Sequence, residues 1–140
     1  MTSHLFVYGT LREDPSHDMY RVLARGARFV GDGSVMARLF DLGDYPGMAL
    51  SGRQDEWVAG EVYEFTESEA GEFLRVLDEY EGLGPDDVLP HEYRRVLVDV
   101  QLAGSTTLTA WAYVLADPVP KYPRIPASDY LQWRKRRASV

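Results

Sequence analysis

The chemistry that stands out in this 140-residue sequence is a group of carboxylates at the end of a predicted helix. Asp78, Glu79 and Glu81 fall in its last turn, before Gly82, a residue type that commonly ends helices. Carboxylates there face the negative end of the helix dipole, which disfavours their charged form by about 0.3–1 kcal/mol. Such a carboxylate has a raised pKa and accepts a proton well near neutrality, which makes Glu81 the first candidate for a catalytic base. The alternative is that all three are solvated surface acids.

The turn after the first predicted strand is a second candidate element. Residues 5–8 form a short apolar run typical of a buried strand, and Gly9 and Thr10 end it abruptly. Backbone N–H groups left without partners at such a turn bind anions, and glycine lets a ligand approach closely. The turn can therefore hold a carboxylate, although a purely structural turn would have the same sequence.

Other common catalytic chemistries are absent from the sequence. Without cysteine, thiolate nucleophiles and disulfides are excluded. The histidine at 91 lacks the second histidine of a zinc-protease helix, no glycine-rich phosphate loop with a lysine is present, and residues 33–34 lack the flanks of a nucleophile elbow. The three histidines are scattered, so neither a metal site nor a serine–histidine pair is predicted. A lone carboxylate base with backbone donors remains.

Composition limits the partners. The formal net charge is −7, and without the basic residues 134–137 the count is 11 basic against 22 acidic, or −11. A body this acidic repels a phosphate backbone, so nucleic-acid binding is not expected. No apolar run is long enough to span a membrane, and the start lacks the basic region of a signal peptide. We expect a cytoplasmic protein that does not bind membranes; its oligomeric state is left open.

One long helix is predicted to position the acids. Apolar residues between 70 and 80 repeat with helical period, and Thr66 and Glu69 have the spacing of a capping box. A shorter helix is predicted from Asp14, and a short polar one at the chain end. We expect a single domain over residues 1–140, with a proline-rich tail over 117–140 packing on the body.

The remaining segments are mostly predicted strands. Residues 57–65 form one strand, and the runs 93–102 and 106–116 form an antiparallel hairpin. The segment 27–42 is predicted as two strands joined by a tight turn at glycines 31 and 33, and 43–47 as a loop. About six strands and two or three helices imply an α+β fold with a small, strongly curved or barrel-like sheet.

Four motifs in order resemble those of the γ-glutamylcyclotransferase-like family. They are Tyr-Gly-Thr-Leu-Arg at 8–12, Leu-Asp-Glu-Tyr-Glu-Gly at 77–82, Tyr-Arg-Arg at 93–95 and Ala-Trp-Ala-Tyr at 110–113. The first motif is more similar to the γ-glutamylamine cyclotransferase and AIG2-like branch than to the glutathione-specific branch, whose loop typically carries serine in place of Thr10.

The resemblance implies a small mixed β-barrel flanked by helices, with Glu81 as general base. It implies cyclisation of a γ-glutamyl group to 5-oxoproline with release of an amine, using neither metal nor cofactor. The residues implied to bind substrate are the first-motif residues Tyr8, Gly9, Thr10 and Leu11, the bordering residues Tyr45 and Pro46, and Tyr113 of the last motif.

Several alternatives stay open at this point. Only the resemblance and the adjacent Gly82 favour Glu81 over Glu79 as the base. The chain departs from the family pattern at 13–16 and 83–92, which flank the place of the leaving amine, so that amine is not identified. A non-catalytic module that binds a γ-glutamyl or other carboxylate metabolite would keep the same loop. An adaptor that uses the tail from 122 to 137 is a further possibility.

Overall fold

The computed structural model describes residues 3–9, 26–43, 45–81, 83, 91–104, 106–117 and 121–138. The strands in these residues are β1 (His4–Val7), β2 (Ala27–Asp41), β3 (Pro46–Leu50), β4 (Trp57–Phe65), β5 (Tyr93–Leu102), β6 (Thr107–Leu115) and β7 (Arg124–Ile125). The helices are a 3₁₀ turn, η2 (Glu67–Glu69), followed by α2 (Ala70–Tyr80), and α3 (Tyr130–Ala138). The helix predicted from Asp14 lies outside the described residues.

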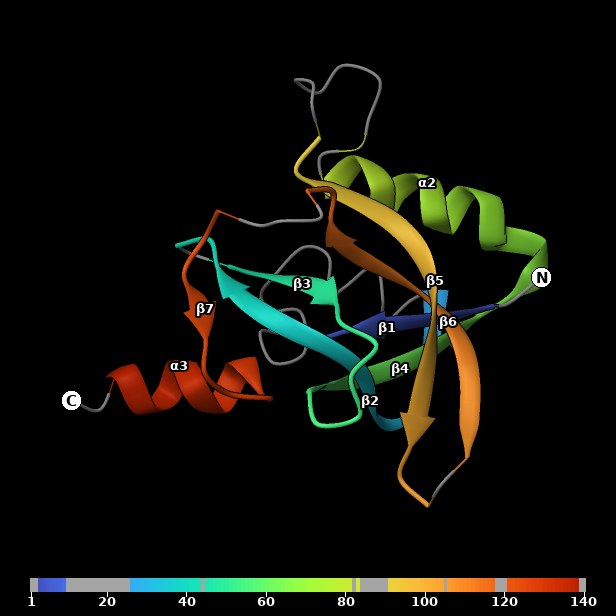
Figure 1. Ribbon diagram of the computed structural model, residues 1–140. Coiled ribbons are helices and arrows are strands. Elements are labelled where there is room, and N and C mark those ends of the chain that lie inside the picture. Colours follow the sequence, from blue (N-terminus) through green and yellow to red (C-terminus); the bar gives the residue numbers. More distant parts are fainter. Residues whose placement is uncertain are drawn as a thin grey trace.

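Five strands close into a barrel (Figure 1). They pair in the order β2, β4, β1, β6 and β5, and β5 pairs back to β2 at Gly33 and Ser34. The pairing of β1 with β6 is parallel, while the other pairings round the barrel are antiparallel. Strands β3 and β7 extend the sheet from β2. The predicted α+β fold with a small mixed barrel is confirmed.

The segment predicted as two strands is one. Strand β2 runs through both glycines, with a register shift against β4 between Phe29 and Gly31. A Cβ atom at Gly33 would lie 2.6 Å from Cγ1 of Val100, so the missing side chain lets β5 cross β2 closely. Gly33 thus leaves the space that the paired strand β5 needs, whereas Gly31 lies at the register shift, where a Cβ atom would meet nothing within 4 Å.

Two further predictions about local structure were wrong. Residues 46 and 47 belong to β3 rather than to a loop, with Pro46 at the first strand position, where a missing N–H is tolerated. The capping box does not form: η2 precedes α2, and neither Thr66 nor Glu69 makes a side-chain cap. The helix nevertheless forms over Ala70–Tyr80, because packing of its apolar face supplies most helical stability.

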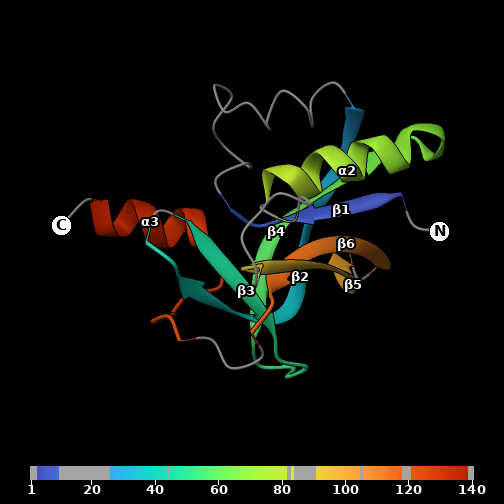
Figure 2. The same ribbon diagram turned by 90° about the horizontal axis from the view of Figure 1, so that it is seen from above.

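The buried residues form two layers. One fills the barrel and includes Phe6, Val35, Met48, Val62 and Val100. The other lies between the barrel wall and α2 and includes Leu5, Phe73, Leu74, Leu77, Tyr93 and Tyr113. Figure 2 shows α2 running beside β1 on one flank of the barrel, with α3 well away from it. The end of α2 is thereby fixed against β5 and β6.

The proline-rich tail contributes β7, which pairs with β2, and α3, whose Tyr130 is buried in the barrel layer. Asp129 caps α3, since its Oδ1 accepts hydrogen bonds from the N–H groups of Leu131 and Gln132. None of the helices among the described residues is long and apolar enough to cross a membrane.

Close strand contact makes Gly60→Ala a test of the barrel. A Cβ atom there would lie 2.6 Å from the Phe6 ring and would also meet the Val7 carbonyl oxygen. We expect a loss of about 1–3 kcal/mol in the free energy of unfolding, measured by urea denaturation. Gly71→Ala, on the exposed face of α2 with open space around it, is the control and should stabilise by up to about 1 kcal/mol. Equal stability of both variants would contradict the close packing of Gly60 against Phe6 and Val7.

Candidate active site

The end of helix α2 places Glu81 beside the barrel. Glu81 is the C-terminal cap residue, and its N–H donates a 2.9 Å hydrogen bond to the Leu77 carbonyl oxygen. Leu77 is only 1% exposed and belongs to the layer between α2 and the barrel. Because the last turn is fixed by this packing, the Glu81 side chain is partly buried instead of extending into solvent.

The surroundings of Glu81 change its acidity. Burial, followed by the charges of Asp78 and Glu92, raises its pKa from 4.5 to about 7. The direction agrees with the sequence-based argument, although burial and neighbouring acids are the causes here. A carboxyl with this pKa is about half ionised at pH 7, so it can both accept and donate a proton.

Glu79 lies in different surroundings. Its side chain is exposed, and Oε1 lies 2.6 Å from Nη1 of Arg75 on the outer side of α2. Of the two acids that the sequence left open, Glu81 is the partly buried one, and its charge acts on buried tyrosines of the barrel.

The charge of Glu81 acts on three buried tyrosines, Tyr8, Tyr93 and Tyr113. Burial is the main cause that raises the pKa of each hydroxyl, and the negative charge of Glu81 adds to the rise in all three. These tyrosines come from the ends of β1 and β6 and the start of β5, so one end of the barrel gathers them.

Hydrogen bonds to the backbone of neighbouring strands fix the hydroxyls of Tyr8 and Tyr93. Tyr8 donates to the Tyr113 carbonyl oxygen at 2.7 Å and accepts from the Met48 N–H at 3.1 Å. Tyr93 donates to the Pro46 carbonyl oxygen at 2.7 Å. The hydroxyls thus tie β1, β3, β5 and β6 together at the site.

An ion pair holds the last turn of α2 to the hairpin. The Arg95 guanidinium donates to both carboxylate oxygens of Asp78, at 2.8 and 3.2 Å, and stacks 4.4 Å from the centre of the Trp111 ring. The Tyr113 hydroxyl donates to the same carboxylate at 2.7 Å. Arg95 is therefore the arginine of the Tyr-Arg-Arg motif that binds an acid of the helix end. Asp78 therefore positions the helix end while its charge acts on Glu81.

The predicted substrate-binding turn is described only in part. A Cβ atom at Gly9 would lie 3.4 Å from Cγ of Pro46, which places the turn against the start of β3. Thr10 and Leu11 lie outside the described residues, as does Gly82. Anion binding by this turn therefore stays a prediction.

Three residues of this region were not predicted as site residues: Tyr93, Glu92 and Tyr122. Tyr93 had a usable signal, because it opens a strand in which Arg95, two positions on, shares its face. Glu92 accepts hydrogen bonds from the Tyr45 hydroxyl at 2.8 Å and the Tyr122 hydroxyl at 3.3 Å. Nothing in the local sequence around Glu92 indicates these distant partners.

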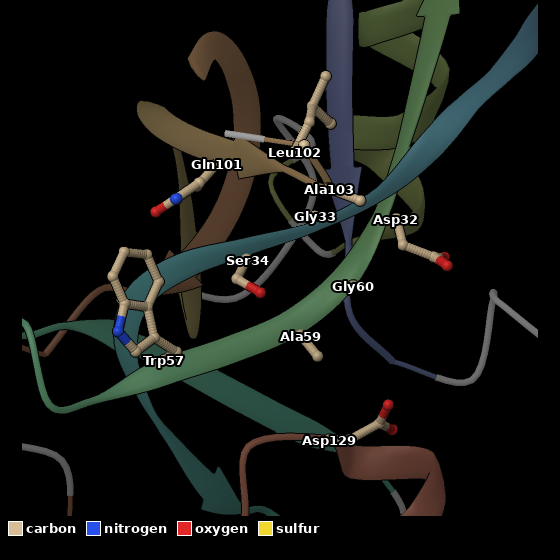
Figure 3. A pocket seen from close by; sticks show the side chains of 11 residues that line it. Asp32, Gly33, Ser34, Trp57, Ala59, Gly60, Gln101, Leu102, Ala103 and Asp129 are labelled. Carbon is tan, nitrogen blue, oxygen red and sulfur yellow. The ribbon is translucent and has the colours of Figure 1, made fainter. Parts of the chain in front are cut away.

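A separate open pocket of about 540 Å³ lies where β2, β4 and β5 meet the start of α3 (Figure 3). Its wall includes Ser34, Trp57, Gln101 and Asp129. Gln101 is eight residues along β5 from Tyr93, roughly 26 Å of strand, so this pocket is distinct from the Glu81 region. Asp129 is already used as a helix cap, and Glu81 does not line the pocket.

Comparison with known proteins identifies the family of this chain. The family described as "Gamma-glutamyl cyclotransferase, AIG2-like" matches residues 5–134. The chain belongs to this family. Membership supports γ-glutamyl cyclotransferase activity and agrees with the resemblance inferred from the four motifs.

Individual relatives point the same way. A "gamma-L-glutamyl-butirosin B gamma-glutamyl cyclotransferase" of Niallia circulans is 36% identical over 97% of this chain and 80% of its own length. A "putative gamma-glutamylcyclotransferase" of Vibrio cholerae is 30% identical over 91% of this chain and 95% of its own length. The crystal structure of an AIG2-like protein from Mus musculus is 28% identical, covers 91% of this chain and 88% of its own, and has a TM-score of 0.67.

The raised pKa of Glu81 predicts a pH-dependent stability difference. Between pH 4.5 and about 7 the folded state holds a proton that the unfolded state releases, so wild-type stability falls as the pH rises through this window. Glu81→Gln has no such loss. We expect the variant to match wild type near pH 4 and to exceed it by on the order of 2 kcal/mol at pH 8 in urea denaturation.

Glu79→Gln is the matched control for this experiment. It removes an exposed acid from the same turn, so its stability difference from wild type should not grow across that pH window. A Glu81→Gln difference that stays constant from pH 4 to pH 8 would show that the Glu81 carboxyl titrates normally in the folded protein.

Proposed function

We propose that this protein cyclises the γ-glutamyl group of a γ-glutamyl amine or amino acid to 5-oxoproline and releases the amine, with Glu81 as general base. The observation that supports it most directly is a partly buried carboxyl with a pKa of about 7, next to three buried tyrosines. Membership of the γ-glutamyl cyclotransferase family supports the reaction.

The first step is proton removal from the substrate. The α-amino group of a γ-glutamyl donor is an ammonium at neutral pH and cannot attack a carbonyl. Ionised Glu81 takes one proton, and the freed amine attacks the γ-carbonyl carbon of the same molecule, forming a carbon–nitrogen bond and a tetrahedral oxyanion. A base with a pKa near the working pH suits this step, since it is ionised often enough and still basic enough.

The second step breaks the original amide bond. Protonated Glu81 returns its proton to the departing nitrogen as the oxyanion reforms the carbonyl and the bond from the γ-carbon to that nitrogen breaks. The ring nitrogen gives up its second proton, and the released amine takes one up to become an ammonium. The protons therefore balance, and Glu81 ends each turnover ionised again.

Binding supplies the rest of the acceleration. The nucleophile and the electrophile belong to one molecule, so holding the donor in a near-attack conformation removes most of the entropic cost, and the cyclisation calls for neither metal nor cofactor. In this proposal the N–H groups of Gly9, Thr10 and Leu11 hold the donor's α-carboxylate. The fixed hydroxyls of Tyr8 and Tyr93 and the adjacent Pro46 form the wall beside Glu81. Tyr113 joins this wall, and Tyr45 borders it.

The direct test is release of 5-oxoproline by wild type and by Glu81→Gln. Donors would be γ-glutamyl amines, γ-glutamyl amino acids and glutathione, with product measured by chromatography. Glutamine keeps the size of the side chain and cannot act as the base, so we expect kcat to fall by about 10²–10⁴-fold. Glu79→Gln should retain wild-type turnover, because Glu79 faces solvent with Arg75.

Two results would contradict the proposal in different ways. Wild-type turnover by Glu81→Gln would remove Glu81 from the role of base. No turnover of any donor by wild type, together with tight binding of glutamate or 5-oxoproline in calorimetry, would favour the non-catalytic binding module instead.

A further inference from the structure

Glu92, Tyr45 and Tyr122 form a small polar cluster at the site, called here the Glu92 rim. Both tyrosine hydroxyls donate to Glu92, one to each carboxylate oxygen. Tyr45 is 42% exposed and Tyr122 39% exposed, and Glu92 is exposed too. The carboxylate is thus held in a fixed orientation at the surface by two partners that leave its full charge in place.

The rim is continuous with the region around Glu81. The Tyr45 ring centre lies 6.4 Å from that of Tyr93. The next residue, Pro46, accepts a hydrogen bond from the Tyr93 hydroxyl at its carbonyl oxygen. The charge of Glu92 also raises the pKa of Glu81, so the two carboxyls are within electrostatic reach. A donor whose γ-carbonyl lies at Glu81 can therefore extend its leaving amine towards the rim.

Among the residues that the structure describes, the charges between Glu81 and the Glu92 rim favour a cation. Arg95 is engaged with both oxygens of Asp78, whereas Glu92 has hydroxyl donors, which carry no compensating charge. The negative charge of Asp117 also acts on Tyr122, where it helps to raise the pKa of the hydroxyl. A carboxylate on the leaving group would be repelled here, while an ammonium would be attracted by Glu92 and by the exposed tyrosine rings.

We propose that the Glu92 rim contacts the leaving amine and selects donors whose leaving amine carries a second, distal positive charge, such as a γ-glutamyl diamine. This inference rests on the proposed cyclotransferase function and specifies its substrate class. Glu92 acts as a specificity-determining residue and takes no part in bond making. Its effect is therefore measured as a ratio of kcat/KM values between donors.

Three donors of matched length isolate the charge: γ-glutamyl-propylamide, γ-glutamyl-1,3-diaminopropane and γ-glutamyl-β-alanine. Their leaving amines are neutral, cationic and anionic at the far end. We expect wild-type kcat/KM to be highest for the diamine and lowest for the β-alanine donor. In Glu92→Gln the ratio of diamine to propylamide should fall about fivefold, as expected for one exposed ion pair.

The donor ratio separates this role from a structural one. Loss of the Glu92 charge also alters the basicity of Glu81, but that change acts on all three donors alike and cancels in the ratio. Tyr45→Phe and Tyr122→Phe, which release the carboxylate while keeping its charge, should lower the ratio less. The wild-type ratio should also shrink at high salt, which screens exposed charges. Glu79→Gln, which removes one negative charge elsewhere, should leave the ratio unchanged.

Failure of the inference and failure of the function can be told apart. Equal turnover of the three donors by wild type, or the same ratio in Glu92→Gln, would overturn the charge selection and leave the cyclotransferase activity standing. No 5-oxoproline from any of the three donors would overturn the proposed function and this inference with it.

Discussion

The burial of one carboxyl group at the end of α2 is the constraint on which the site depends. A helix end with an acidic last turn would be more stable with its side chains in water, yet packing of Leu77 against the barrel keeps Glu81 partly buried. That position gives the carboxyl a pKa of about 7, and its cost in folding free energy grows above pH 4.5 and is complete above about pH 7. The same feature thus weakens the fold and, in the proposed function, gives the general base a suitable pKa.

The three acids near the tyrosines differ because their partners differ. Asp78 binds Arg95 and Tyr113, which makes it a structural tie between α2 and the hairpin. Glu81 has its charged form disfavoured by burial and by both neighbouring acids, which gives it basicity near neutral pH. Glu92 is held by tyrosine hydroxyls at the surface, where its charge can act on an incoming ligand. In the proposed function, positioning, proton transfer and donor selection are divided among these three acids.

Sequence reasoning succeeded where local pattern and final burial coincide. The apolar period of α2, the alternation in β4 and the position of Glu81 at a helix end are properties of neighbouring residues, so they could be inferred directly. The single strand β2 could not, because the approach of Val100 from β5 decides how Gly33 is used. Likewise the Glu92 rim depends on hydrogen bonds from Tyr45 and Tyr122, which lie 47 and 30 residues away in the chain. The sequence next to Glu92 does not indicate these contacts.

The most direct test of this account is a titration of the Glu81 side-chain carboxyl by NMR, using protein labelled at the glutamate carboxyl carbon and the spectrum of Glu81→Gln for assignment. We expect a midpoint near 7, about 2.5 units above the ordinary value for glutamate. A midpoint at about 4.5 would show that the carboxyl is solvated like a surface acid, and it would contradict the central claim that burial prepares Glu81 as a base.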